Sequence, residues 1–276
     1  MTRLIKRFSI ITAIAAVLAA SAAAQKNVPF EDGETLAYEG KVSKIIQGIA
    51  VADLTFTIDR PASDADYLIK AEAKSKGTLL KLFRFSFLQR VESTIDDGDF
   101  KVTRTVKHDV QKERVRNSEA LFDYGDGRVT YTETDPKDPM KAPRRIASEI
   151  EGATHDLVSG VYTLRMLPLA VGKTFDLKIS DSGLVYDVPV KVTAREMQKT
   201  EIGRVMCFRV EPQVFGPGRL IENEGSMVIW ITDDARRIPV RSRVNASIGK
   251  IEIKIRSVSN AKTKNAPPAA QTTGTR

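Results

Sequence analysis

Residues 250–256, KIEIKIR, alternate strictly between isoleucine and charged side chains. Successive side chains of an extended chain point to opposite faces, so Ile251, Ile253 and Ile255 share one face and the charges share the other. A strand with one apolar and one charged face is typical of an antiparallel sheet that has its core on one side. This segment therefore predicts a half-buried antiparallel strand near the end of the chain.

The same two-residue period recurs along most of the sequence. The predicted strands are 34–45, 50–59, 67–73, 85–95, 100–107, 114–124, 128–133, 174–180, 184–194, 203–211, 226–232 and 239–244. Residues 96–99 (DDGD) and 124–127 (YGDG) are reverse-turn sequences, and we interpret the paired acids Asp96/Asp97 and Asp233/Asp234 as turn formers. Many strands without βαβ alternation predict a mainly β fold, a single curled antiparallel sheet that forms an open or half barrel.

One segment breaks the strand period. Residues 154–168 (THDLVSGVYTLRMLP) place apolar side chains at helical spacing, with Thr154 or Asp156 as the cap and Pro168 as the stop. They predict one amphipathic helix that flanks or plugs the concave side of the sheet. His155, at the start of this helix, is expected to be a surface or capping residue.

The first 24 residues have the three parts of a secretory signal peptide. Three basic residues precede an apolar run at 8–20, and residues 22–24 (AAA) provide a small-residue cleavage site. The run of about 13 residues is shorter than the roughly 20 that span a bilayer as a helix, so no transmembrane segment is expected after cleavage. We predict a periplasmic protein with one β-rich domain at 25–260 and a polar tail without a fold at 261–276.

The formal net charge of +8 lies mostly outside the predicted domain. The leader and the tail hold six basic residues and no acid, which leaves 37 basic against 35 acidic residues in the rest of the chain. A nearly neutral domain without a basic helix argues against a nucleic-acid partner. Residues 141–145 (KAPRR) form one remaining basic cluster, expected to be a solvated loop, with an anionic-lipid contact as the alternative.

Chemical motifs are largely missing from the sequence. Cys207 is the only cysteine, so no internal disulfide can form, and its alternating context predicts a buried small apolar residue. The two histidines, His108 and His155, have no zinc-binding spacing, and no nucleophile elbow or phosphate-binding glycine loop occurs. We predict no metal site, no cofactor and no catalytic residues, which disfavours an enzyme.

An apolar segment suggests a binding surface. Residues 77–88 begin like a helical turn and pass into a strand of alternating phenylalanines, while residues 227–231 (MVIWI) are apolar on both faces of their strand. The ordinary explanation is that these side chains are core. The sharper hypothesis is that they hold an acyl chain between sheet and helix. The predicted binding residues are Leu79, Leu82, Phe83, Phe85, Phe87 and Trp230.

Three stretches together resemble a known family. They are 33–38 (GETLAY), 156–169 (DLVSGVYTLRMLPL) with Gly172 soon after, and 228–240 (VIWITDDARRIPV). In combination they resemble the exported bacterial family called domain of unknown function 3108, over roughly residues 30–257. The resemblance implies an envelope location and a mostly β fold, similar to the open half-barrels of periplasmic lipoprotein carriers. It implies no activity and no catalytic residues.

These observations lead to three hypotheses of function. The first is a periplasmic β-rich module that binds an apolar or lipid-like ligand, or an envelope component, without catalysis. The second is a cell-envelope scaffold or interaction protein that uses a sheet edge or the tail to bind a protein partner. The third is a hydrolase built on two carboxylates, which residue types alone do not exclude.

Overall fold

The computed structural model describes residues 28–43, 49–60, 62, 65–246 and 249–260. The predicted signal peptide at 1–24 and the predicted tail at 261–276 lie outside these residues.

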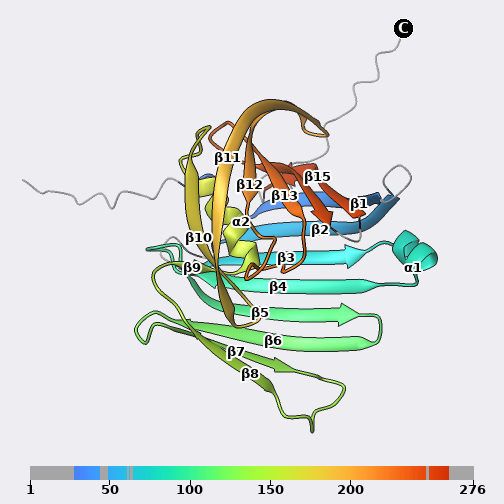
Figure 1. Ribbon diagram of the computed structural model, residues 1–276, viewed down its shortest axis with the longest axis vertical. Helices are drawn as coiled ribbons and strands as arrows, with labels where there is room; N and C mark the ends of the chain where they lie inside the picture. Colours follow the sequence, from blue (N-terminus) through green and yellow to red (C-terminus); the bar gives the residue numbers. More distant parts are fainter. Residues whose placement is uncertain (1–27, 44–48, 61, 63–64, 247–248, 261–276) are drawn as a thin grey trace, which may run out of the picture.

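In the described residues, fifteen strands form one sheet, in which most strands lie beside their neighbours in sequence (Figure 1). The strands are β1 (Glu34–Ser43), β2 (Ile49–Asp59), β3 (Tyr67–Ser75), β4 (Phe87–Ile95), β5 (Val102–Gln111), β6 (Arg114–Asp123), β7 (Arg128–Thr134), β8 (Arg144–Glu149), β9 (Thr154–His155), β10 (Thr174–Asp181), β11 (Leu184–Thr200), β12 (Gly203–Pro212), β13 (Ser226–Thr232), β14 (Pro239–Ala246) and β15 (Gly249–Ser259). Each strand pairs with its neighbour in sequence from β1 to β8 and from β10 to β15, and β15 pairs antiparallel with β1. The pairings are antiparallel except for the short β9–β10 bridge.

The predicted fold class is confirmed. The sheet is large, curled and unclosed, and each of the predicted strands is present with bounds that differ by a few residues. One expectation needs correction, because β8 begins at Arg144, inside the predicted loop 141–145. Its backbone pairs with β7, with Thr132 opposite Arg145, and this long-range pairing outweighs the polar composition of the segment.

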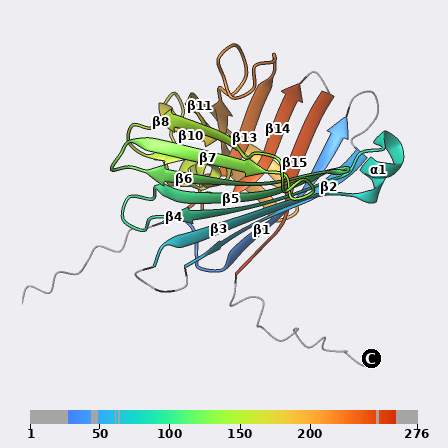
Figure 2. The same cartoon turned by 90° about the horizontal axis from the view of Figure 1, so that it is seen from below.

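Two helices accompany the sheet in the described part of the chain. Helix α2 (Leu157–Met166) lies inside the curve of the sheet, as predicted, and its N-cap is Asp156 (Figure 1). Helix α1 (Gly77–Phe83) is a short helix between β3 and β4 at one extremity of the sheet, as Figure 2 also shows.

Helix α2 packs against both halves of the sheet. Val158 and Tyr162 join the apolar cluster formed mainly by β2 to β7, whereas Leu164 joins the cluster formed by β10 to β13. A third cluster lies on the other face of β13, around Trp230 and Cys207. The long β11–β12 hairpin folds over this third cluster.

The β7–β8 edge of the sheet meets the tight turn between β10 and β11. Gly183, between β10 and β11, has a φ of +84°, and a Cβ at this position would lie 2.6 Å from the Cβ of Tyr131. Ser148 Oγ of β8 donates to the Gly183 carbonyl oxygen at 2.7 Å. Glycine is required here both for the backbone conformation and for the close approach of β7.

Candidate functional site

Asp156 fixes the start of helix α2 to the N-terminal half of the sheet. Its carboxylate accepts the backbone N–H of Val158 at 2.9 Å and of Ser159 at 2.7 Å, which caps the helix. The same carboxylate accepts hydrogen bonds from Ser93 of β4 and from Thr105 of β5. These charge-assisted bonds in a buried position hold the helix terminus against β4 and β5.

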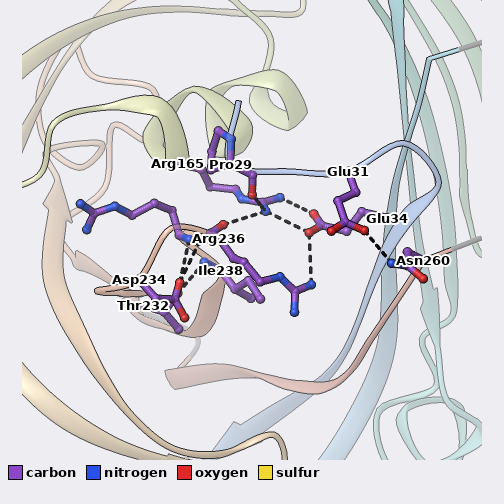
Figure 3. Close-up of polar contacts among 10 residues, drawn as sticks. Pro29, Glu31, Glu34, Arg165, Thr232, Asp234, Arg236, Ile238 and Asn260 are labelled. Carbon is purple, nitrogen blue, oxygen red and sulfur yellow. Dashed lines mark hydrogen bonds and ion pairs between the residues drawn. The ribbon is translucent and has the colours of Figure 1, made fainter. Parts of the chain in front are cut away.

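Arg165 fixes the other end of the helix. Its Nη1 lies 2.6 Å from Glu34 Oε1, and its Nη2 donates at 2.9 Å to each of the carbonyl oxygens of Pro29 and Arg236 (Figure 3). The side chains of Arg165 and Glu34 are almost completely buried. One guanidinium therefore joins the helix to β1 and to the β13–β14 turn.

An apolar cavity of about 390 Å³ lies between helix α2 and the C-terminal half of the sheet. Its wall includes the helix, strands β10, β11, β13 and β14, and the loop after β12. The lining residues are Leu157, Gly160, Val161, Leu164, Leu177, Ile179, Asp181, Val188, Val190, Pro212, Val214, Phe215, Leu220, Ile221, Met227 and Val244. Asp181 is the only ionisable residue among them. Leu157 is 47% exposed and Ile221 is 37% exposed, so the cavity opens to solvent on their side.

Two local features shape this cavity. Gly160 of α2 faces β10, where an added Cβ would lie 3.0 Å from Ile179 Cδ1, so the helix and the Ile179 side chain are in close contact here. The loop at 213–225 then closes one side with Phe215, Leu220 and Ile221. Within this loop, Gly216 N–H donates to the Ile221 carbonyl oxygen at 2.9 Å, so the backbone forms a closed turn.

A smaller cavity of about 80 Å³, lined by both polar and apolar side chains, adjoins the apolar one. The two share Leu157 and Asp181, which lie at their boundary. The smaller cavity is lined by inward-facing residues of β4 to β7 together with the β10–β11 turn, and Lys107 is its only cation. The apolar cavity thus adjoins a smaller one that has some polar side chains in its wall.

The three stretches of sequence at 33–38, 156–169 and 228–240 meet beside these cavities. Arg165 joins Glu34 to the Arg236 carbonyl, and Tyr38 Oη donates to the Pro239 carbonyl oxygen at 2.8 Å. The family model described as "Protein of unknown function (DUF3108)" matches residues 37–256. This chain belongs to the DUF3108 family.

A solved structure shares the DUF3108 fold seen here. The β-barrel-like DUF1849 protein of Brucella abortus superposes with a TM-score of 0.56 at 9% sequence identity, over 82% of this chain and 97% of that chain. A Bacteroides fragilis protein with a YmcC-like fold gives a TM-score of 0.34 at 10% identity, over 84% and 98% of the two chains. At 9% identity the likeness to the Brucella abortus protein concerns the fold alone. None of the curated proteins matches the sequence.

The residues predicted to bind a ligand lie in two separate places. Trp230 is buried on the face of β13 away from α2, where its Nε1 donates to Glu196, and the guanidinium carbons of Arg241 and Arg243 lie 4.9 Å and 5.3 Å from its ring centroid. The other five belong to α1, to the start of β4 and to the link between them, and five strands separate β4 from β13 in the sheet. Those five are Leu79, Leu82, Phe83, Phe85 and Phe87.

Within this second group, Leu82 is 58% exposed, and the rings of Phe85 and Phe87 are 6.3 Å apart. The Phe83 side chain lies outside the described part of the structure. None of the five described side chains of the predicted set lines the apolar cavity. Ligand binding by these residues stays a prediction.

Sequence reasoning missed the residues of the apolar cavity. Leu177, Ile179, Val188 and Val190 have the alternation expected of strands, and they were predicted only as strand residues. Alternation says that they share a face, but it does not say whether that face meets side chains or a cavity. The one available signal was Gly160 in the middle of a predicted helix.

His155 is not the surface residue that the sequence suggested. It is only 5% exposed, because β9 pairs with β10 and draws the start of α2 into the core. Burial lowers the pKa of its imidazole to about 4, although the neighbouring Asp156 carboxylate acts in the opposite direction. The imidazole is therefore neutral at pH 7, with Nδ1 3.3 Å from Thr163 Oγ1.

Cys207 is buried, as predicted. Burial, with smaller contributions from the carboxylates of Asp234, Glu196 and Asp233, raises the pKa of its thiol to about 12, so the nucleophilic thiolate is scarce at neutral pH. Among the described residues, no group of three or more metal-binding side chains is arranged to hold an ion. In the same part of the chain, neither helix has the length and apolar character needed to cross a bilayer.

Proposed function

We propose that this DUF3108 protein is an exported periplasmic binding module that holds an apolar or lipid-like ligand, without catalysis, between α2 and strands β10 to β14. The observation that carries the proposal is the cavity of about 390 Å³, whose wall is aliphatic and aromatic apart from Asp181 and Gly160. Ligand pockets in proteins have volumes of about 300–1,000 Å³ and mostly apolar linings. Export follows from the signal-peptide sequence of residues 1–24.

The energetics favour an apolar occupant. Protein interiors are close-packed, and a void lined by aliphatic groups loses the dispersion contacts that a filled core provides. An acyl chain entering past Leu157 would restore those contacts and remove its own surface from water, at about 25 cal/mol per Å². Water would gain little there, because Asp181 is the only charged group in the wall.

The polar side chains in the wall of the smaller cavity favour a ligand with one polar end. This cavity begins at Leu157 and Asp181, where the apolar cavity ends, and it provides Lys107 and the Ser180 hydroxyl. The Asp156 carboxylate in its wall is already occupied by donors from the helix and from β4 and β5. A single-chain amphiphile would place its chain in the larger cavity and its polar end in the smaller one.

Binding of a fluorescent fatty acid, dansyl-undecanoic acid, tests the proposal. Val161→Phe places a larger side chain in the cavity from the helix, and probe affinity should fall about tenfold or more. Val171→Phe is the matched control, because Val171 is exposed and lies outside the cavity lining. Equal probe binding by the wild type and Val161→Phe would contradict the proposed cavity.

A third variant separates the cavity from the segment predicted from sequence. Leu82→Ser removes the exposed apolar side chain of α1 and should leave probe affinity unchanged. If Leu82→Ser lost probe binding and Val161→Phe did not, the binding site would lie at α1 instead. Native mass spectrometry of protein recovered from the periplasm then asks whether a natural ligand co-purifies, and cell fractionation tests the location.

A further inference from the structure

We infer that α1 and the neighbouring β5–β6 turn form a docking surface for a lipid bilayer that contains anionic phospholipid. The surface is defined by Lys81, Leu82, Arg84, Phe85 and Lys112. It goes beyond the proposed ligand site, and it does not depend on whether the cavity is occupied.

The surface stands at one extremity of the molecule. Helix α1 projects from the end of the sheet in both views, on the side of the β3–β4 connection (Figures 1 and 2). It is held to the sheet at its start, where Thr78 Oγ1 donates to the Ala50 carbonyl oxygen and Lys76 Nζ lies 2.8 Å from Glu39 and 3.0 Å from Asp53. The projection is therefore a fixed part of the fold.

The end of the segment is fixed as well. Phe87 N–H donates to Ser75 Oγ at 3.0 Å, and Lys112 N–H donates to the Ser86 carbonyl oxygen at 3.0 Å. The second bond places the β5–β6 turn against the chain that leaves α1. Lys112 Nζ accordingly lies 5.8 Å from the ring centroid of Phe85. Residues from two separate parts of the chain thus share one surface.

An apolar side chain is exposed within this surface. Leu82 is 58% exposed, and Phe85 beside the helix is only half-buried. A single exposed leucine is ordinary on a soluble protein. The combination with cations around it is what points to a membrane interface, where apolar side chains enter the headgroup region and basic ones meet phosphates.

The cations of this surface are not neutralised. Among the described residues, no carboxylate lies within ion-pair distance of Lys81, Arg84 or Lys112, whereas Lys76 at the base of the helix has two. The nearest acid in sequence to Lys112 is Glu113, which is itself paired with Lys137 at 3.5 Å. The surface is therefore positively charged, which is complementary to an anionic leaflet.

Its size argues against a folded protein partner. A stable protein interface buries about 800 Å² on each side. One short helix and one turn offer a smaller surface area than that. A bilayer needs no matching shape, since a few cations around an apolar tip are enough for weak, reversible attachment. A bilayer is therefore the occupant that these residues fit.

Co-sedimentation with vesicles tests this inference. The protein, with residues 1–24 removed, is mixed at low salt with vesicles of phosphatidylcholine alone or with about a third of phosphatidylglycerol. Wild type should sediment with the anionic vesicles only. The charge reversal K81E/R84E should lower the partition coefficient about tenfold or more, and Leu82→Ser should lower it severalfold.

Matched controls make the result specific. K173E/K191E reverses two exposed lysines elsewhere, and Leu121→Ser removes another exposed leucine, so both should bind vesicles like the wild type apart from the small effect of net charge. Val161→Phe should also bind vesicles normally, which separates this surface from the cavity. Equal losses in K173E/K191E and K81E/R84E, wild-type binding by K81E/R84E, or equal binding to neutral vesicles would each overturn the inference.

Discussion

Arg165 and Glu34, 131 residues apart in sequence, form a two-pronged ion pair in the interior, with Nη1–Oε1 at 2.6 Å and Nη2–Oε2 at 3.1 Å. The guanidinium also lies over the rings of Phe30 and Tyr162, at 5.3 Å and 5.2 Å from their centroids. Through this one group, α2 is joined to β1 and to the β13–β14 turn. The position of α2 is what separates the cavity from the rest of the core.

Glu34→Gln should therefore destabilise the protein strongly. It leaves the Arg165 charge buried without its counter-ion, which costs about 3–5 kcal/mol of unfolding free energy. Urea unfolding followed by circular dichroism measures the change. The exposed pair Arg104–Glu119 is the control, and Glu119→Gln should cost less than about 1 kcal/mol. Similar losses in the two variants would contradict the structural importance of the buried pair.

Gly183→Ala should destabilise the contact between the β10–β11 turn and strands β7 and β8. Alanine is strained at a φ of +84°, and its Cβ would collide with Tyr131 and Ile146. We expect a loss of about 2–3 kcal/mol in unfolding experiments. Gly152→Ala is the matched control. The φ of Gly152 is also positive, at +67°, but an added Cβ meets nothing within 4 Å. This variant should therefore lose only about 1 kcal/mol of unfolding free energy, from backbone strain alone. The contact would be unimportant if the two losses were equal.

Stability should fall between pH 6.5 and pH 4 because of His155. Its pKa is about 4 in the folded state against 6.5 for a histidine in the unfolded chain, so the unfolded state binds more protons in this window. Folding is then about 2 kcal/mol less favourable at pH 5 than at pH 7 from this group alone. Unfolding free energies at the two pH values measure it, and His155→Gln should reduce the difference. His108→Gln should keep the wild-type pH dependence; if it abolished that dependence, the assignment to His155 would be wrong.

The Cys207 thiol should be unreactive in the native protein. It is buried and its pKa is raised to about 12, so both access and the thiolate fraction are low at pH 8. Labelling with Ellman's reagent should proceed slowly without denaturant and within seconds in concentrated urea. Rapid stoichiometric labelling of the native protein would contradict the burial of Cys207 within the third apolar cluster.

The local pattern of side chains was sufficient for most of the fold. KIEIKIR at 250–256 lies within β15, and the same alternation marks most other strands, because side chains of a strand alternate whatever it pairs with. Apolar spacing with Asp156 and Pro168 at its ends likewise placed α2, since caps and stops act over a few residues. The motifs at 33–38, 156–169 and 228–240 also identified the family.

Only the tertiary structure decided where the site lies. The cavity is made by α2 together with five other segments, and the predicted Trp230 and Leu82 are on different parts of the molecule. The burial of His155 and the pairing of Arg165 with Glu34 likewise depend on chain segments that are distant in sequence. Periodicity determines which residues share a face, whereas the register and curl of the sheet determine what that face meets.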